Sequence, residues 1–362
     1  MKSINYHRQL VMLMATVILF LSCTKSGGSS AKATTNTVTT YAGTVSAGAG
    51  NGTGVLASFS FPSAIISGPG GNMYIGDFGN NLVRTVSLST AAVNTYAGVV
   101  TAGLVNGPAA SAKFRGTANI VFDPTGNLFV ADEENNVIRE ITTAGNVITV
   151  AGTGTAGYLD GPASSAQFNY PEGMVMDGSG NLYVADGHNN LIRKINISTG
   201  TVSTYAGTGV PGFANGSVSS ATFNDPYGMA MDASGNLYVT DVLNNCIRKI
   251  TVSSGTVSTF AGSGTKGLSN GAAATATFYY PLGCTFDSGG NMFVADTYNN
   301  VIRRVSSTGN VTTFAGAGVQ GSADGVASVA SFSFPIGLLV SGNAVYVADT
   351  HNNEIRKITI GQ

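Results

Sequence analysis

Six aspartates in this chain recur at steps of 53 to 55 residues, and their carboxylates are its most regular reactive groups. Carboxylates that converged on one axis would suit a divalent cation. An arginine follows each aspartate after seven residues, however, so every carboxylate has its own counter-ion. A pair present in every repeat most simply ties two strands or two repeats together through a charge-assisted hydrogen bond. We therefore predict a structural role for all six pairs: Asp77–Arg84, Asp132–Arg139, Asp186–Arg193, Asp241–Arg248, Asp296–Arg303 and Asp349–Arg356.

A second group of polar and aromatic residues does not repeat, which makes it the better candidate for a binding site. These residues lie in the short segments that lead into each repeat, around a recurring proline. If the repeats close into a ring, these segments surround one mouth of its central channel, and a small molecule, sugar or peptide could bind there. The alternative, that they are idiosyncratic loop residues around a water-filled hole, stays open. The candidates are Arg115, Asn119, Asn169, Tyr170, Glu172, Asn224, Asp225, Tyr227 and Tyr280.

The elements that must position these residues are short strands. The phrase GNLYVADGHNNLIRKI, clearest at residues 180–195, returns six times with small changes. Within the fourth unit, alternating residues and Gly-containing turns predict strands at about 228–232, 236–241, 246–252 and 256–261. Four antiparallel strands in each of six units predict an all-β fold, a six-bladed β-propeller.

One further predicted strand precedes the first of the six repeats. Residues 37–43 read TVTTYAG and resemble the last strand of each unit, yet no repeat precedes them. The sixth unit lacks such a strand of its own, because the chain ends soon after Ile360. We predict that the N-terminal strand completes the last blade, which closes the ring and removes a free sheet edge.

A recurring phenylalanine marks the loops between the predicted blades. Each loop contains an Asn-Gly or Asp-Gly turn, and a proline follows the phenylalanine by three residues in all units but the second, which has Thr117. We interpret each phenylalanine as a wedge that anchors its loop between neighbouring blades. The six are Phe59, Phe114, Phe168, Phe223, Phe278 and Phe332.

These two phrases resemble NHL repeats, whose hallmark is a YVAD-x-x-N-N-x-I-R-K-I core followed by a v-x-T-x-A-G strand. The resemblance covers about residues 37–360 and implies a six-bladed propeller. NHL propellers serve as RNA-binding modules, protein-interaction domains and sensor domains, and a related fold serves as an amidating lyase. Fold alone does not choose among these functions.

An enzyme of the lactonase or lyase kind is the alternative function that the resemblance to related propellers suggests. Gluconolactonase-like proteins hold a divalent metal in the channel with carboxylates and amides, so this alternative points to Glu172, Asp225, Asn119 and Asn224 and to calcium or zinc. Amidating lyases use a histidine-rich zinc site instead. Beyond residue 22 the chain has only His188 and His351, in the third and sixth units, which lie opposite each other in a six-membered ring.

The N-terminal residues have the pattern of an export signal and are not expected to form part of the propeller. Lys2 and Arg8 precede an apolar run at residues 10–21, which is short for a membrane span and typical of a signal peptide. Residues 20–23 (FLSC) resemble the lipobox of bacterial lipoproteins, in which the cysteine is lipidated. We predict a signal peptide at 1–22, lipidation at Cys23, a Ser/Gly/Thr-rich tether at 23–36 and the propeller at 37–361. An ordinary secretory signal is the alternative, and it leaves Cys23 without a role.

Composition narrows the classes of partner. Seventeen basic and eighteen acidic residues leave the chain almost neutral, which argues against a nucleic-acid surface. Cys246 and Cys284 occupy positions where four other units carry Leu, Val, Ile or Met, so both are expected to be buried apolar residues. A disulfide between them is possible in an exported protein, but repeat position gives it no support.

Together these observations predict a lipid-anchored, extracytoplasmic binding or interaction module without catalysis, on the periplasmic or outer side of the cell envelope. Its ligand would be a protein, a peptide or a glycan. No cofactor is predicted for this function, and a channel metal is expected only for the enzymatic alternative.

Overall fold

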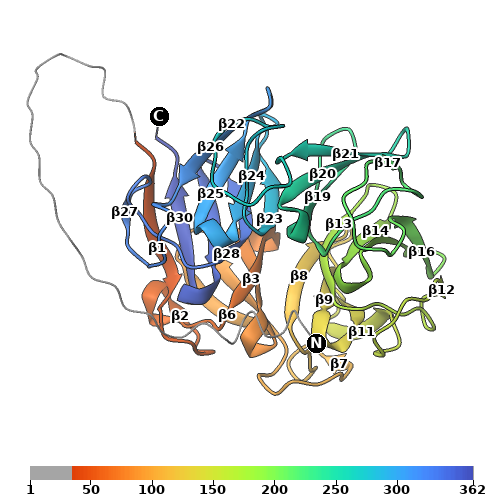
Figure 1. Ribbon diagram of the computed structural model, residues 1–362. Helices are drawn as coiled ribbons and strands as arrows, with labels where there is room; N and C mark the ends of the chain where they lie inside the picture. Colours follow the sequence, from red (N-terminus) through yellow and green to blue (C-terminus); the bar gives the residue numbers. More distant parts are fainter. Residues whose placement is uncertain (1–34, 362) are drawn as a thin grey trace, which may run out of the picture. The chain divides into compact units, whose positions relative to one another are not determined.

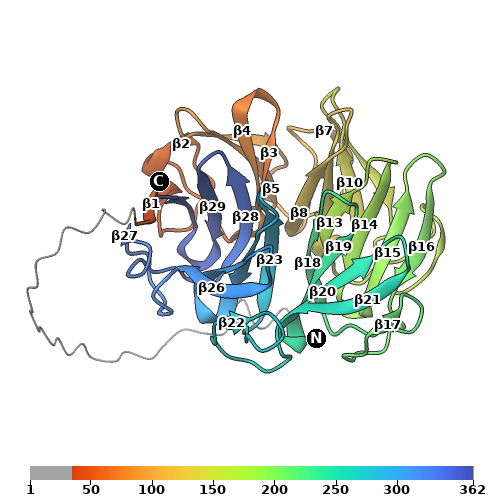
Figure 2. The ribbon, with the colours of Figure 1, turned by 90° about the horizontal axis from the view of Figure 1, so that it is seen from above.

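A computed structural model describes residues 35–361 as six antiparallel β-sheets with 3-10 turns and no α-helix (Figures 1 and 2). The predicted signal peptide, the lipidation site at Cys23 and almost all of the tether lie outside these residues. Within them, no helix is long and apolar enough to cross a membrane.

The fourth sheet shows how one blade is built. Its four main strands are β18 (Pro226–Met231), β19 (Leu237–Asp241), β20 (Cys246–Thr251) and β21 (Thr256–Ala261), close to the predicted ranges. A fifth strand, β17 (Gly216–Ser217), pairs with β21 at the outer edge, so the order is β17-β21-β20-β19-β18. The prediction of four strands was therefore one strand short, because the glycine of the Asn-Gly turn and the residue after it pair with β21.

The other blades repeat this order from the outer to the inner edge. The first blade consists of β2 (Gly52–Thr53), β6 (Ala92–Ala97), β5 (Leu82–Ser87), β4 (Asn72–Asp77) and β3 (Pro62–Gly68). The second consists of β7 (Gly107–Pro108), β11 (Asn146–Ala151), β10 (Val137–Ile141), β9 (Leu128–Asp132) and β8 (Thr117–Phe122). The third consists of β12 (Gly161–Pro162), β16 (Thr201–Ala206), β15 (Leu191–Asn196), β14 (Asn181–Asp186) and β13 (Pro171–Met176). In the fifth and sixth blades the strands are β22 (Gly271–Ala272), β26 (Asn310–Ala315), β25 (Val301–Val305), β24 (Met292–Asp296) and β23 (Pro281–Phe286); and β27 (Gly325–Val326), β1 (Thr37–Gly43), β30 (Glu354–Thr359), β29 (Ala344–Asp349) and β28 (Pro335–Ser341).

The sheets form a closed ring. Each innermost strand packs against the innermost strand of the next blade, and β28 of the last blade packs against β3 of the first. The N-terminal strand β1 pairs antiparallel with β30 from Thr37↔Thr359 to Gly43↔Glu354, which confirms the predicted closure (Figure 1). A glycine on the inner strand permits close approach in four blades; a Cβ at Gly283, for example, would lie 1.9 Å from the carbonyl oxygen of Ile336.

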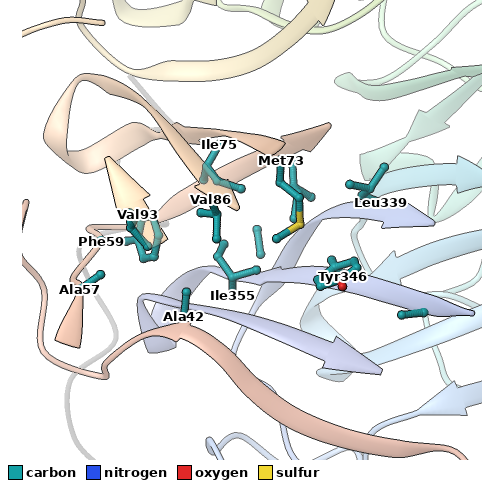
Figure 3. Close-up of a cluster of buried hydrophobic side chains, with 13 residues drawn as sticks. Ala42, Ala57, Phe59, Met73, Ile75, Val86, Val93, Leu339, Tyr346 and Ile355 are labelled. Carbon is teal, nitrogen blue, oxygen red and sulfur yellow. The ribbon is translucent and has the colours of Figure 1, made fainter. Parts of the chain in front are cut away.

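Hydrophobic clusters between neighbouring blades form the core. Figure 3 shows one in which Phe59 packs with Ile75 and Val86 of the first blade and Ala42 and Ile355 of the last. The equivalent phenylalanines are likewise fully buried, and those at 114, 168, 223, 278 and 332 lie in clusters that combine two consecutive blades. This confirms their interpretation as wedges.

The six Asp–Arg pairs form a repeated polar network inside the blades. In the third blade, Asp186 Oδ2 accepts a 2.8 Å bond from Arg193 Nη1, and both side chains are fully buried. Arg193 also donates to the carbonyl oxygen of Gln167 and to Asp160, and its guanidinium lies 5.1 Å from the centroid of the Phe168 ring. Each pair thus joins two strands of one blade to the loop that carries the wedge. The other five pairs span 2.7 to 2.8 Å and are equally buried.

Both cysteines beyond residue 34 are free thiols. Cys246 is fully buried, as predicted, and Cys284 is only partly buried, at the edge of a hydrophobic cluster. Burial raises the pKa of the Cys284 thiol to about 12, so it is a poor nucleophile.

Candidate functional site

The candidate site lies where two short segments of each blade meet at the start of the inner strand, and we call the ring of these segments the rim. One segment precedes the inner strand; the other is the 3-10 turn after the repeated aspartate. Backbone hydrogen bonds join the two segments in every blade. In the third blade, the N–H of Gly187 donates to the carbonyl oxygen of Tyr170, and the N–H of His188 donates to the carbonyl oxygen of Asn169. The six turns are η3 (Phe78–Asn80), η4 (Glu133–Asn135), η5 (Gly187–Asn189), η6 (Val242–Asn244), η7 (Thr297–Asn299) and η8 (Thr350–Asn352).

The rim backbone is held in an unusual conformation by the second asparagine of each Asn-Asn pair. The residue before the proline position has a positive φ in all six blades, and five of these residues are not glycine: Phe61, Tyr170, Asp225, Tyr280 and Phe334, at 49° to 60°. Each donates its backbone N–H to an asparagine side chain of the preceding blade, as Tyr170 does to Asn136 at 3.0 Å. The asparagines are therefore more than turn residues, because they hold rim side chains in place across the blade boundary.

Three carboxyl groups from consecutive blades meet on one side of the rim, and we call Glu133, Glu172 and Asp225 the acidic cluster. Glu133 opens η4, Glu172 lies on β13 and Asp225 immediately precedes β18. A Cβ placed at Gly187 would lie 3.2 Å from both Glu172 Oε1 and Asp225 Oδ1, so these two carboxyl groups flank the same point. Gly187 takes the turn position filled by a side chain in every other blade, and its lack of one lets the carboxyl groups approach.

The acidic cluster has no matching cation among residues 35–361. Glu172 is only 5% exposed, and its buried Oε2 atom has no hydrogen-bond partner there; neither has the buried Oδ1 of Asp225. Burial and the neighbouring carboxylates Glu134 and Asp225 raise the pKa of Glu133 to about 8. Burial, with Asp241 adding to it, raises the pKa of Asp225 to about 6, and burial beside Asp225 and Glu133 raises the pKa of Glu172 well above its usual range.

An apolar patch continues the rim beyond the acidic cluster. Val242 of η6, Leu282 of β23 and Ile336 of β28 are buried together, and the half-buried rings of Tyr227 and Tyr280 pack against them. Burial and then the charges of Glu172, Glu133 and Asp225 raise the pKa of Tyr227. Tyr227 thus borders both regions.

The opposite side of the rim is lined by successive ring contacts across the fifth, sixth and first blades, which we call the aromatic arc. The Tyr280 and Tyr298 centroids lie 4.6 Å apart, and Tyr298 meets Phe334 edge-on at 4.9 Å. Phe334 stacks on His351 at 4.4 Å, and His351 meets Phe61 at 5.4 Å. All five rings are half-buried.

The structure brings together only some of the predicted site residues. Glu172, Asp225 and Tyr227 meet at the acidic cluster and Tyr280 joins the aromatic arc, while Tyr170 contacts His188 at 4.3 Å in the third blade.

The remaining predicted residues serve other contacts. Arg115 forms an exposed 3.0 Å ion pair with Glu134. Asn119 accepts a bond from the backbone of Met174 at 3.2 Å, which ties two inner strands. Asn169 and Asn224 each donate a backbone N–H to the repeated aspartate of their blade.

Glu133, Gly187 and Tyr298 are rim residues that the sequence reasoning did not select. They occupy the two variable positions between the repeated aspartate and the Asn-Asn pair. The same criterion of non-repetition, applied to this turn as well as to the segment before the inner strand, would have found them.

The four residues of the enzymatic alternative include only two carboxylates, Glu172 and Asp225, beside the amides Asn119 and Asn224. No group of three or more His, Cys, Asp or Glu side chains within residues 35–361 has an arrangement that could hold a metal ion. His188 and His351 have different neighbours, Tyr170 for the first and Phe61 with Phe334 for the second.

Comparison with known sequences identifies the repeat. Residues 168–195 match the model of the NHL repeat. The chain is 29% identical over 278 residues to Protein SUPPRESSOR OF QUENCHING 1, chloroplastic, of Arabidopsis thaliana, and 28% identical over 344 residues to NHL repeat-containing protein 2 of Bos taurus. The alignments cover 72% and 82% of this chain but only 26% and 47% of those proteins.

Solved structures share the fold at lower sequence identity. An auxiliary nutrient binding protein from Bacteroides ovatus superposes with a TM-score of 0.70 at 17% identity, over 90% of this chain and 77% of that one. A streptogramin B lyase superposes with a TM-score of 0.54 at 15% identity, over 90% and 98%. Residues 35–361 therefore form a six-bladed β-propeller, and residues 168–195 within it match the NHL repeat.

Proposed function

We propose that this propeller is a non-enzymatic binding module whose ligand docks on the rim. The observation that supports this most is the division of the rim: buried, unpaired carboxyl groups on one side face an arc of half-buried aromatic rings on the other. Convergent polar groups beside aromatic surface are typical of sites for peptides and sugars. The fold similarity to a nutrient binding protein is compatible with this proposal.

The proposal extends to location. We infer that Cys23 carries a lipid that anchors the propeller on the extracytoplasmic side of the cell envelope. The apolar run at residues 10–21 and the lipobox-like FLSC at residues 20–23 support this inference. Detergent-phase partitioning of the full chain tests this: Cys23→Ala should move the protein from the detergent phase to the aqueous phase. Unchanged partitioning would overturn the anchor while leaving the binding module intact.

A rim variant tests the binding function. Saturation-transfer NMR would record contacts between the protein and two probe pools, neutral acetylated pentapeptides and uncharged oligosaccharides. Phe334→Ala should weaken the signals severalfold because it interrupts the aromatic arc. Tyr158→Ala is the matched control, since Tyr158 is an exposed aromatic residue outside the rim. Equal loss in both variants, or none, would contradict docking on the rim.

The enzymatic alternative has its own measurement. δ-Gluconolactone would be incubated with the protein and added Ca²⁺ or Zn²⁺, and ring opening would be followed by acid release. Turnover that requires the metal and is lost in Glu172→Ala would replace the binding module with a lactonase; we expect no turnover above the buffer rate.

A further inference from the structure

We propose that the rim ligand is a peptide or protein segment that presents a lysine side chain, with its ammonium group placed among Glu133, Glu172 and Asp225. This inference rests on the proposed function and specifies its ligand class. The apolar patch would cover the stem of the lysine, and the aromatic arc would hold residues on either side of it.

The acidic cluster lacks a counter-charge within residues 35–361. Glu172 is 95% buried with an unpartnered oxygen, and the charged groups that act on it are three other acids, Asp225, Glu133 and Asp186. The nearest rim cation, Arg115, is directed to Glu134 at the surface. A fold gains nothing from gathering carboxyl groups in this way, because each loses hydration and repels the others. A cationic ligand supplies the charge that the described chain lacks.

The shape of the acidic cluster favours a compact cation. Glu172 Oε1 and Asp225 Oδ1, from consecutive blades, flank one point beside Gly187, and the charge of Glu133 acts on Glu172. Acceptors that converge in this way suit the three donors of an ammonium group better than the planar fork of a guanidinium. No metal-binding arrangement exists among these side chains, as described above.

The carboxyl groups of the acidic cluster are not openly exposed. Glu172 is buried, and at its neighbour Gly173 the inner strands β13 and β18 are in close contact, since a Cβ there would lie only 2.1 Å from the carbonyl oxygen of Tyr227. An amine attached directly to a sugar ring would have to bring the ring with it. A lysine carries its charge on a slender four-carbon stem, and Tyr227 and Val242 offer that stem an apolar wall.

The test uses two immobilised-protein pull-downs read by mass spectrometry. The probes are equimolar libraries Ac-X-X-Lys-X-X-NH₂ and Ac-X-X-Nle-X-X-NH₂, where norleucine has the same stem as lysine without the charge. We expect the lysine library to be enriched about tenfold or more over the norleucine library, because a charge-assisted bond to desolvated carboxyl groups is lost in the latter. Glu172→Gln should abolish the enrichment while leaving retention of the norleucine library unchanged.

A second variant separates a site effect from misfolding. Gly187→Thr places between Glu172 and Asp225 the residue type that the fifth and sixth blades carry at this position, Thr297 and Thr350. Because those turns have the same backbone, the variant should fold and yet lose the lysine preference. Thr297→Ser in the equivalent turn of the fifth blade is the control, because Thr297 belongs to neither the acidic cluster nor the apolar patch.

Each other outcome overturns part of the hypothesis. Equal retention of both libraries that depends on Phe334 but not on Glu172 would overturn the lysine site and keep rim binding. Glu172-dependent retention of an arginine library or of tri-glucosamine in place of lysine would assign the acidic cluster to that cation instead. Retention of neither library, or retention insensitive to both Glu172 and Phe334, would overturn the lysine site and rim docking of peptides together.

Discussion

Two sets of buried carboxyl groups in this propeller have opposite surroundings. Asp186 and its five equivalents each meet an arginine, an asparagine amide and a backbone N–H, and they occur in every blade. Glu172 and Asp225 have oxygens without partners and occur once. Burial removes water from the carboxyl groups of both sets, but only in the first set do protein hydrogen bonds replace the lost bonds to water. The first set stabilises the fold, and we propose that the second binds a ligand.

The largest expected effect comes from breaking a repeated pair. Arg303→Ala should lower the free energy of unfolding by about 3–5 kcal/mol, because it leaves Asp296 buried and uncompensated. Urea unfolding followed by circular dichroism measures this. Arg115→Ala is the control: its ion pair with Glu134 is exposed, so a change within about 1 kcal/mol is expected. Similar losses in both variants would contradict the distinction between the two kinds of pair.

The acidic cluster should respond in the opposite direction. Glu172→Gln should raise the free energy of unfolding at pH 8 by about 1–3 kcal/mol, because the amide avoids the cost of a carboxyl group whose pKa is raised by burial.

The sign of the pH dependence follows from the direction of the shift. A folded pKa above the unfolded value favours the folded state at low pH, and this contribution is lost as pH rises. The stabilisation by Glu172→Gln should therefore shrink towards pH 5 and grow towards pH 8, in paired thermal melts. Glu133→Gln should show the same pH dependence between about pH 4.5 and about pH 8, the ordinary and the folded-state pKa values of Glu133. A variant that destabilises the protein at pH 8 would show that the cluster is structural.

The smallest effect is expected at a position where blades differ without consequence. Cys246→Val introduces the residue found at the same place in the second and fifth blades, and the site is fully buried among apolar neighbours. Its free energy of unfolding should change by less than about 1.5 kcal/mol. A larger loss would mean that equivalent positions in different blades are not interchangeable, which would weaken inferences drawn from repetition.

The fold was predictable because its elements repeat along the sequence. Part of the candidate site could not be predicted in this way, because its residues do not repeat. The strand periodicity, the unpaired segment at 37–43 and the Asp–Arg spacing each recur six times or complete a sixfold pattern, so the sequence was enough to predict them. The two-residue outer strands were missed because an Asn-Gly turn looks the same whether or not it pairs with a sheet.

The site depends on contacts that no period encodes. Glu133, Glu172 and Asp225 are separated by 39 and 53 residues and meet only because three blades share one rim. The absence of a side chain at Gly187 also matters, and a glycine in a chain with 49 of them attracts no notice. Asn119 shows a contact that the sequence does not predict, because its side chain joins two inner strands.

The closing strand has a consequence for the order in which the protein forms. The side chain of Asn353 bonds to the carbonyl oxygen of Val45, 308 residues earlier, and Gly361 donates to Asn36 across 325 residues. During synthesis β1 is made first, yet its main partner β30 emerges last, so the N-terminal strand must wait with unpaired edges while five blades are completed. Such distant pairing slows folding, because the entropy of closing the whole chain is lost before any contact compensates for it. The last blade is therefore the step at which a nascent chain is most exposed to misassembly with another copy.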